Sequence, residues 1–142
     1  MKKILLAVDG SESCNKAVNT VIELSYLIDF EVTILNVVED KISIQATNKK
    51  GITDEINKHD SAKKSAKEIV TECANNFNED TKVEKITREG VPAEIICEEA
   101  GKEDYDLVVI SDMGRNSIQK FLLGSTTEKV VRHCKKSVLV AK

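Results

Sequence analysis

Three short, almost continuous apolar runs place the strongest limit on the fold of this chain. They span residues 4–8, 107–110 and 138–141. A strand that is apolar on both faces is typical of the centre of a parallel sheet, where helices cover each side. The runs therefore predict a mostly parallel sheet in an α/β protein.

The segments between these runs carry signals for helices. Apolar residues recur every three or four positions from Cys14 to about Ile28, and a second such stripe follows Asp54. Pro92 suits the first position of a helix, so residues 93–101 should form a short one. A fourth helix should run from residue 125 to about residue 134.

Two further segments have the character of strands. Residues 31–38 are rich in β-branched side chains and mostly apolar, whereas residues 81–88 alternate polar and apolar side chains, as a half-exposed strand at a sheet edge would. Residues 39–53 show no periodicity and predict a long loop. Such a loop is either a functional lid or a solvated connection.

Together these elements predict one domain spanning residues 1–142. Strands that alternate with helices imply right-handed crossovers and a doubly wound, five-stranded sheet with helices on both faces. In such sheets ligands bind beyond the carboxyl ends of the strands. Asp9, Val37 and the 111–124 loop all follow strand ends, so one crevice can collect all three.

The composition excludes several classes of protein. A net charge of −3 leaves no basic excess of the kind that nucleic-acid binders show, and no apolar stretch reaches the roughly 20 residues of a membrane helix. A cytoplasmic protein is expected. The four cysteines form no C-x-x-C pair, which argues against a disulfide scaffold and a zinc site and favours reduced residues on helices.

Residues 107–127 contain a candidate phosphate site, because a buried strand, a loop with glycines and a helix start follow one another. Gly114 and Gly124 allow a close approach of the backbone to a ligand, and the helix start offers N–H groups that stabilise anions. Neither a Walker A motif nor G-x-G-x-x-G occurs. Alternatively, Ser125 and Glu128 form a capping box that satisfies the helix start without a ligand.

The whole chain resembles the universal stress protein family, in segments that follow the family's order. These segments are Lys2–Ser11, Leu35–Val38, Gly90–Ala93, Asp106–Gly114, Leu122–Thr127 and Ser137–Val140. The resemblance implies a Rossmann-like fold of the adenine nucleotide alpha hydrolase-like type, with strand order 3-2-1-4-5. It also implies a homodimer formed through the C-terminal strand.

Nucleotide-binding members of the family carry G-x-x-G, nine residues and G-[ST], and the resemblance implies the same roles here. Gly114, Gly124, Ser125 and Thr126 would hold the phosphates and ribose of ATP, with or without Mg²⁺ or Mn²⁺. Ala7, Val8, Asp9 and Val37 would line the adenine pocket. Ser111, Met113 and Arg115 complete the predicted site. The carboxylate of Asp9 can accept a hydrogen bond from the nucleoside, or it can serve as a turn or cap residue.

Two departures from the family motif precede Gly114. Ser111 stands where a glycine is expected, and its Cβ should hinder close backbone approach. Asp112 brings a carboxylate that should repel phosphate unless a divalent metal bridges the two. Arg115 and Lys120 supply compensating positive charge. Because some family members lack the motif and bind no ATP, both groups remain open for this chain.

Three functions follow from these patterns. The first is a homodimeric ATP-binding module of stress response or signalling, with at most slow hydrolysis. The second is a nucleotide-free protein-interaction module of the same family. The third, a phosphohydrolase or nucleotidyl-transfer enzyme, is the weakest, because no nucleophile, base and orienting group are brought together. No catalytic residue is assigned, and His59 and His133 are interpreted as structural.

Overall fold

The computed structural model describes residues 2–39, 49–102, 104–114 and 122–142. In chain order the elements are β1 (Lys3–Ala7), α1 (Cys14–Ser25), β2 (Glu31–Val38), α2 (Lys49–Ala74), β3 (Val83–Glu89), α3 (Pro92–Lys102), β4 (Leu107–Ser111), α4 (Ser125–His133) and β5 (Ser137–Ala141). The five strands pair in parallel in the order β3-β2-β1-β4-β5, which confirms the predicted strand order.

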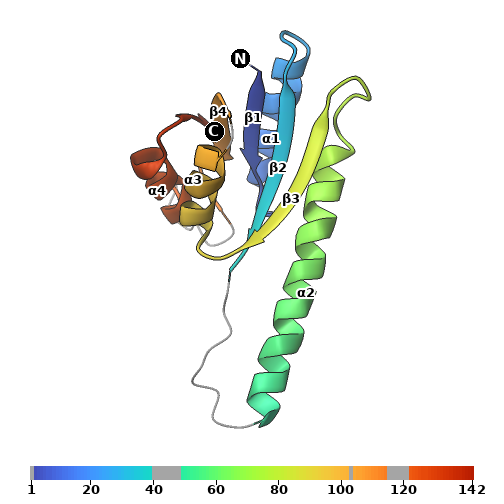
Figure 1. Ribbon diagram of the computed structural model, residues 1–142, viewed down its shortest axis with the longest axis vertical. Helices are drawn as coiled ribbons and strands as arrows, with labels where there is room; N and C mark the ends of the chain where they lie inside the picture. Colours follow the sequence, from blue (N-terminus) through green and yellow to red (C-terminus); the bar gives the residue numbers. More distant parts are fainter. Residues whose placement is uncertain (1, 40–48, 103, 115–121) are drawn as a thin grey trace.

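Each face of the sheet carries its own apolar core. Successive side chains of a strand point to opposite faces, so Ile4 and Leu6 of β1 pack under α1 and α2, whereas Leu5 packs under α3 and α4. Val109 and Val108 of β4 divide in the same way. Burying such a side chain stabilises the fold by about 1.5–3 kcal/mol. Helices cover both faces, as predicted (Figure 1).

The two edges of the sheet are less buried than its centre. In β3, half-buried Val83 and Ile86 are separated by exposed Glu84 and Lys85, which confirms that this is a half-exposed edge strand. At the opposite edge, β5 begins with exposed Ser137 and continues with three half-buried residues. Among the described helices, none combines the length and apolar character needed to cross a membrane.

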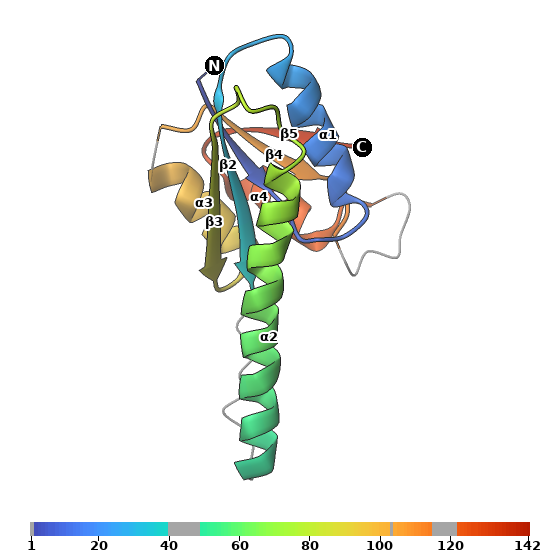
Figure 2. The same cartoon turned by 90° about the vertical axis from the view of Figure 1, so that its right-hand side faces the viewer.

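Two predicted helix boundaries are wrong. Helix α2 begins at Lys49 rather than at Asp54, so the predicted 39–53 loop is shorter than expected, and its residues 40–48 lie outside the described part of the chain. The first turns of α2 project beyond the carboxyl ends of β2 and β3 (Figure 2). Because no sheet lies beneath these turns, no buried apolar stripe marks them in the sequence.

Helix α1 ends at Ser25, three residues before the predicted Ile28. Its last turn tightens, since the Leu24 carbonyl accepts the N–H groups of both Leu27 and Ile28 at 3.0 and 3.1 Å. The side chain of Leu27 is 78% exposed and does not extend the buried stripe. The apolar periodicity therefore continued past the point where the helix leaves the core.

All four cysteines are free thiols. Cys14 and Cys73 belong to the core under α1 and α2, whereas Cys97 and Cys134 pack against the core on the other face. Three of them lie on helices, and Cys134 follows the last residue of α4. This agrees with the predicted reduced cysteines.

Candidate functional site

A cavity of about 700 Å³ lies at the carboxyl ends of the central strands. The strand order changes direction between β1 and β4, which is where ligands bind in open α/β sheets. Its walls come from β1, β2 and β4 and the segments that follow them, from the start of α4, and from α2 and α3. The predicted crevice is therefore present.

The structure brings almost all of the predicted site residues to this one cavity. Its lining includes Ala7, Val8, Asp9, Val37, Ser111, Met113, Gly114, Gly124, Ser125 and Thr126. Arg115, the remaining member of the predicted site, and Lys120 lie outside the described residues.

One wall of the cavity was not predicted. It is formed by Ala62, Ser65, Ala66 and Ile69 of α2, and the lining also includes Pro92 and Ile96 of α3. Most of the α2 residues were assigned to a buried helix face, but the sequence does not show that this face extends past the sheet. The small side chains of Ala62, Ser65 and Ala66, which recur at helical spacing, are the signal that could have revealed the cavity.

Asp9 follows β1 and is held by the turn after it. Its Oδ1 accepts hydrogen bonds from the N–H and the hydroxyl of Ser11 at 2.9 and 2.6 Å. Gly10 has φ +76°, a conformation that glycine adopts without a steric cost. The interpretation of Asp9 as a turn residue is therefore correct, although the carboxylate also lines the cavity.

Gly114 allows a close approach between the loop after β4 and Asp9. A Cβ built on Gly114 would lie 3.0 Å from Oδ2 of Asp9. In the helix that follows the turn after Asp9, burial raises the pKa of the Cys14 thiol. The thiol thus stays protonated at neutral pH, which suits a core residue rather than a nucleophile.

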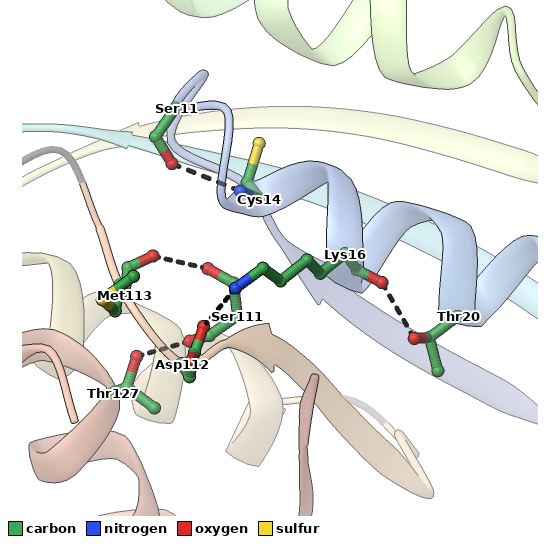
Figure 3. A network of polar contacts seen from close by, with 8 residues as sticks. All are labelled: Ser11, Cys14, Lys16, Thr20, Ser111, Asp112, Met113 and Thr127. Carbon is green, nitrogen blue, oxygen red and sulfur yellow. Dashed lines mark hydrogen bonds and ion pairs between the residues drawn. The ribbon is translucent and has the colours of Figure 1, made fainter. Parts of the chain in front are cut away.

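The backbone after β4 is fixed on two sides. The N–H of Asp112 donates to Ala141 O in β5 at 3.0 Å, and the carbonyl of Asp112 accepts the N–H of Gly124 at 2.7 Å. The Ser111 hydroxyl donates to the carbonyl of Met113 at 2.7 Å (Figure 3). The Ser111 side chain is thus used within its own loop.

The Asp112 carboxylate points toward α1 rather than into the cavity. Its Oδ1 lies 3.3 Å from Nζ of Lys16, and Asp112 is absent from the described cavity lining, whereas its neighbours Ser111 and Met113 are present (Figure 3). The sequence predicted that this carboxylate repels phosphate unless a divalent metal bridges the two. The structure gives it a basic partner outside the cavity.

The start of α4 faces the cavity without a side-chain cap. Gly124 is the N-cap and Ser125 the first helical residue, and no side chain of the described residues makes a cap hydrogen bond. Glu128 pairs instead with Arg132 at 3.0 Å. The predicted capping box is therefore wrong. The first N–H groups of α4 carry the partial positive charge of a helix N-terminus and border the cavity at Ser125 and Thr126.

The charged side chains of the described lining are acidic. Asp9 and Glu39 line the cavity, and no lysine, arginine or histidine does so within the described ranges.

The two histidines are not part of the described lining. The Nε2 atom of His59 is 3.2 Å from Glu89 at the end of β3. Lys63 also binds Glu89, and these contacts hold the pKa of that carboxyl below its usual range. His133 ends α4.

Comparison with known proteins agrees with the geometry. The Universal stress protein family model matches residues 1–142. A putative universal stress protein of Staphylococcus saprophyticus is 31% identical, over 99% of this chain and 83% of that protein. The solved structure of MJ0577 from Methanocaldococcus jannaschii has a TM-score of 0.76 and 30% identity, covering 99% of this chain and 95% of that one.

A universal stress protein family protein of Arabidopsis thaliana, solved with AMP bound, shares the fold. Its TM-score is 0.71 and its identity 22%, over all of this chain and 92% of that one.

Proposed function

This chain belongs to the universal stress protein family, and from that premise and the geometry of its cavity we propose that it is an adenine-nucleotide-binding module of stress response or signalling. ATP is the proposed ligand. The observation that carries the proposal is the uncapped start of α4, which borders a large cavity at the switch point of the sheet.

The start of α4 supports the binding of phosphate. Its free N–H groups and the hydroxyls of Ser125 and Thr126 are donors, and the helix dipole favours an anion there. Gly114 leaves room beside Asp9 that any side chain would fill. If a divalent cation accompanies the phosphates, the Asp9 carboxylate beside Gly114 is positioned to bind it.

The remaining walls support the binding of a nucleoside. A cavity of about 700 Å³ falls within the usual range of ligand pockets, and apolar side chains such as Val37, Ile69 and Ile96 offer apolar surface against which a base can pack. The Arabidopsis protein with AMP bound is one case in which this fold holds an adenine nucleotide. As a carboxylate on the lining, Asp9 can accept a hydrogen bond from the ribose or base.

We propose binding with at most slow hydrolysis. The hydroxyls of Ser111 and Thr127 both donate to backbone carbonyls at 2.7 Å: that of Ser111 within its own loop, and that of Thr127 from α4 to the end of β4. This use is structural and gives neither hydroxyl a base to activate it. The predicted cytoplasmic location stays a prediction.

Thermal unfolding with and without Mg·ATP tests the proposal. A ligand at 100 times its Kd stabilises the folded state by about 2.7 kcal/mol, which corresponds to a rise of roughly 5–10 °C for a domain of this size. Gly114→Ala should weaken this response, because its Cβ would crowd Asp9. Gly101→Ala is the matched control, since its Cβ would meet none of the described atoms within 4 Å.

Two results would contradict the proposal. One is the absence of any shift with millimolar ATP, ADP or AMP. The other is an equal rise in melting temperature with Mg·ATP in the Gly114→Ala and Gly101→Ala variants, which would show that the nucleotide does not bind next to Gly114.

We also propose a homodimer formed through β5. Within the described residues this strand pairs with β4 alone, so its other edge, which carries half-buried Val138, Leu139 and Val140, is open to pairing with another chain. An apolar edge of this kind promotes aggregation unless a specific partner strand covers it. Solution scattering at micromolar concentration should give the mass of two chains, and a monomer mass would refute the dimer.

A further inference from the structure

We propose that Lys16 is a specificity-determining residue of the nucleotide site, because it neutralises Asp112 and so allows nucleotides with several phosphates to bind. This inference rests on the proposed nucleotide binding. It assigns Lys16 no contact with the nucleotide, so Lys16 acts through Asp112.

The position of Asp112 makes its charge relevant to the site. Its carbonyl accepts the N–H of Gly124, the N-cap of the helix proposed to hold phosphate. Its neighbours Ser111 and Met113 both line the cavity. With its backbone hydrogen-bonded to β5 and to α4, Asp112 cannot move away from this region without breaking those bonds.

Lys16 occupies an unfavourable position for a cation within α1. It is the third residue of this helix, where the dipole favours acidic side chains. From there its Nζ reaches Asp112 Oδ1 at 3.3 Å, across 96 residues of sequence (Figure 3). Because the helix itself gains nothing from a lysine at this point, the contact with Asp112 gives the residue its role.

The charge balance of the described site explains why the pair matters. Asp9 and Glu39 already place two carboxylates on the lining, and the lining contains no basic side chain within the described ranges. An unpaired Asp112 would add a further negative charge beside the phosphates. Since ATP carries more negative charge than AMP, the resulting repulsion must grow with the number of phosphates.

Lys16→Met tests this inference, because methionine keeps the apolar stem of the side chain and removes the charge. Two unit charges roughly 8 Å apart near a protein surface, screened by physiological salt, alter affinity by about three- to fivefold. We expect Lys16→Met to weaken binding by about that factor for each added phosphate from AMP to ADP to ATP, measured by isothermal titration calorimetry in buffer without divalent cations.

Two further variants separate charge from structure. In the Lys16→Met, Asp112→Asn double variant the repelling carboxylate is also gone, so the affinity for ATP should return to within about twofold of the wild type. Lys102→Met removes another lysine from an exposed ion pair, 2.9 Å from Glu98 on α3, and should leave the ratio of ATP to AMP affinity unchanged.

The outcomes distinguish this inference from the proposed function. If wild-type protein binds no adenine nucleotide, the proposed function fails. If it binds them but Lys16→Met weakens AMP and ATP by the same factor, or Asp112→Asn does not restore the double variant, only the role of Lys16 is overturned. Raising the salt concentration should shrink the difference between wild type and Lys16→Met, which a purely structural effect would not do.

Discussion

Replacing Thr127 with valine should destabilise the protein by removing one buried hydrogen bond. The Thr127 hydroxyl donates to the carbonyl of Ser111 at 2.7 Å and so ties the first turn of α4 to the end of β4. Thr127 is 3% exposed and Ser111 4% exposed, so water cannot replace the lost donor. Valine has nearly the same shape, and the substitution leaves no cavity.

The expected loss follows from the unpaired carbonyl. A buried polar group without a partner costs about 1–3 kcal/mol. For a chain of 142 residues, this lowers the melting temperature by roughly 3–10 °C. Urea unfolding followed by circular dichroism should show a lower midpoint with an unchanged m-value, since the fold and the surface exposed on unfolding stay the same.

Thr126→Val is the matched control, because Thr126 is also in the first turn of α4 but is only half-buried, and its hydroxyl makes no hydrogen bond to the described residues. Its unfolding free energy should stay within about 0.5 kcal/mol of the wild type. Equal unfolding free energies for the Thr127→Val and Thr126→Val variants would refute the assignment of this hydrogen bond as a tie between α4 and β4.

Two more substitutions test the frame that positions the site. Gly90→Ala should lower the unfolding free energy by about 1–3 kcal/mol in thermal melts, because Gly90 has φ +142° and an added Cβ would lie 2.9 Å from Ile95; a melt like that of Gly101→Ala would contradict this. Asp106 accepts the N–H groups of residues 2–3 at 2.7 and 2.9 Å, and these bonds lower its pKa. The resulting stability is present above the unfolded pKa of about 3.9 and is lost as the pH falls through the lower folded value. In urea unfolding, the free energy of unfolding of Asp106→Asn should therefore be lower than that of the wild type at pH 7, and the two values should become equal in acid. A difference that does not change with pH would contradict the assignment.

Elements buried on both sides were the most predictable from sequence. The predicted 31–38 strand coincides with β2, and the apolar runs at residues 4–8 and 107–110 overlap β1 and β4. Burial selects apolar and β-branched side chains along such strands, so the sequence pattern alone identifies them. The start of α2 at Lys49 left no such pattern, because its first turns project past the sheet.

The candidate site was predictable in part. Topology alone places the ends of β1, β2 and β4 at one edge of the sheet, and this brought Asp9, Val37 and the 111–124 loop together. The wall contributed by α2 depends on how far that helix overhangs the sheet. The direction of the Asp112 side chain depends on Lys16, 96 residues earlier in the chain. Neither relation is visible in local sequence patterns.

The departures at Ser111 and Asp112 change the site less than their chemistry alone suggests. The effect of a polar side chain on an anion site depends on where its polar atoms point and on whether its charge has a partner. The Ser111 hydroxyl is bonded to the carbonyl of Met113, and the Asp112 carboxylate to Lys16. The donors proposed to hold phosphate are instead backbone N–H groups at the start of α4, whose positions follow from the Asp112 carbonyl bond to Gly124. A motif residue that differs from the family pattern can therefore keep its structural role through its backbone, while its side chain is neutralised from another helix.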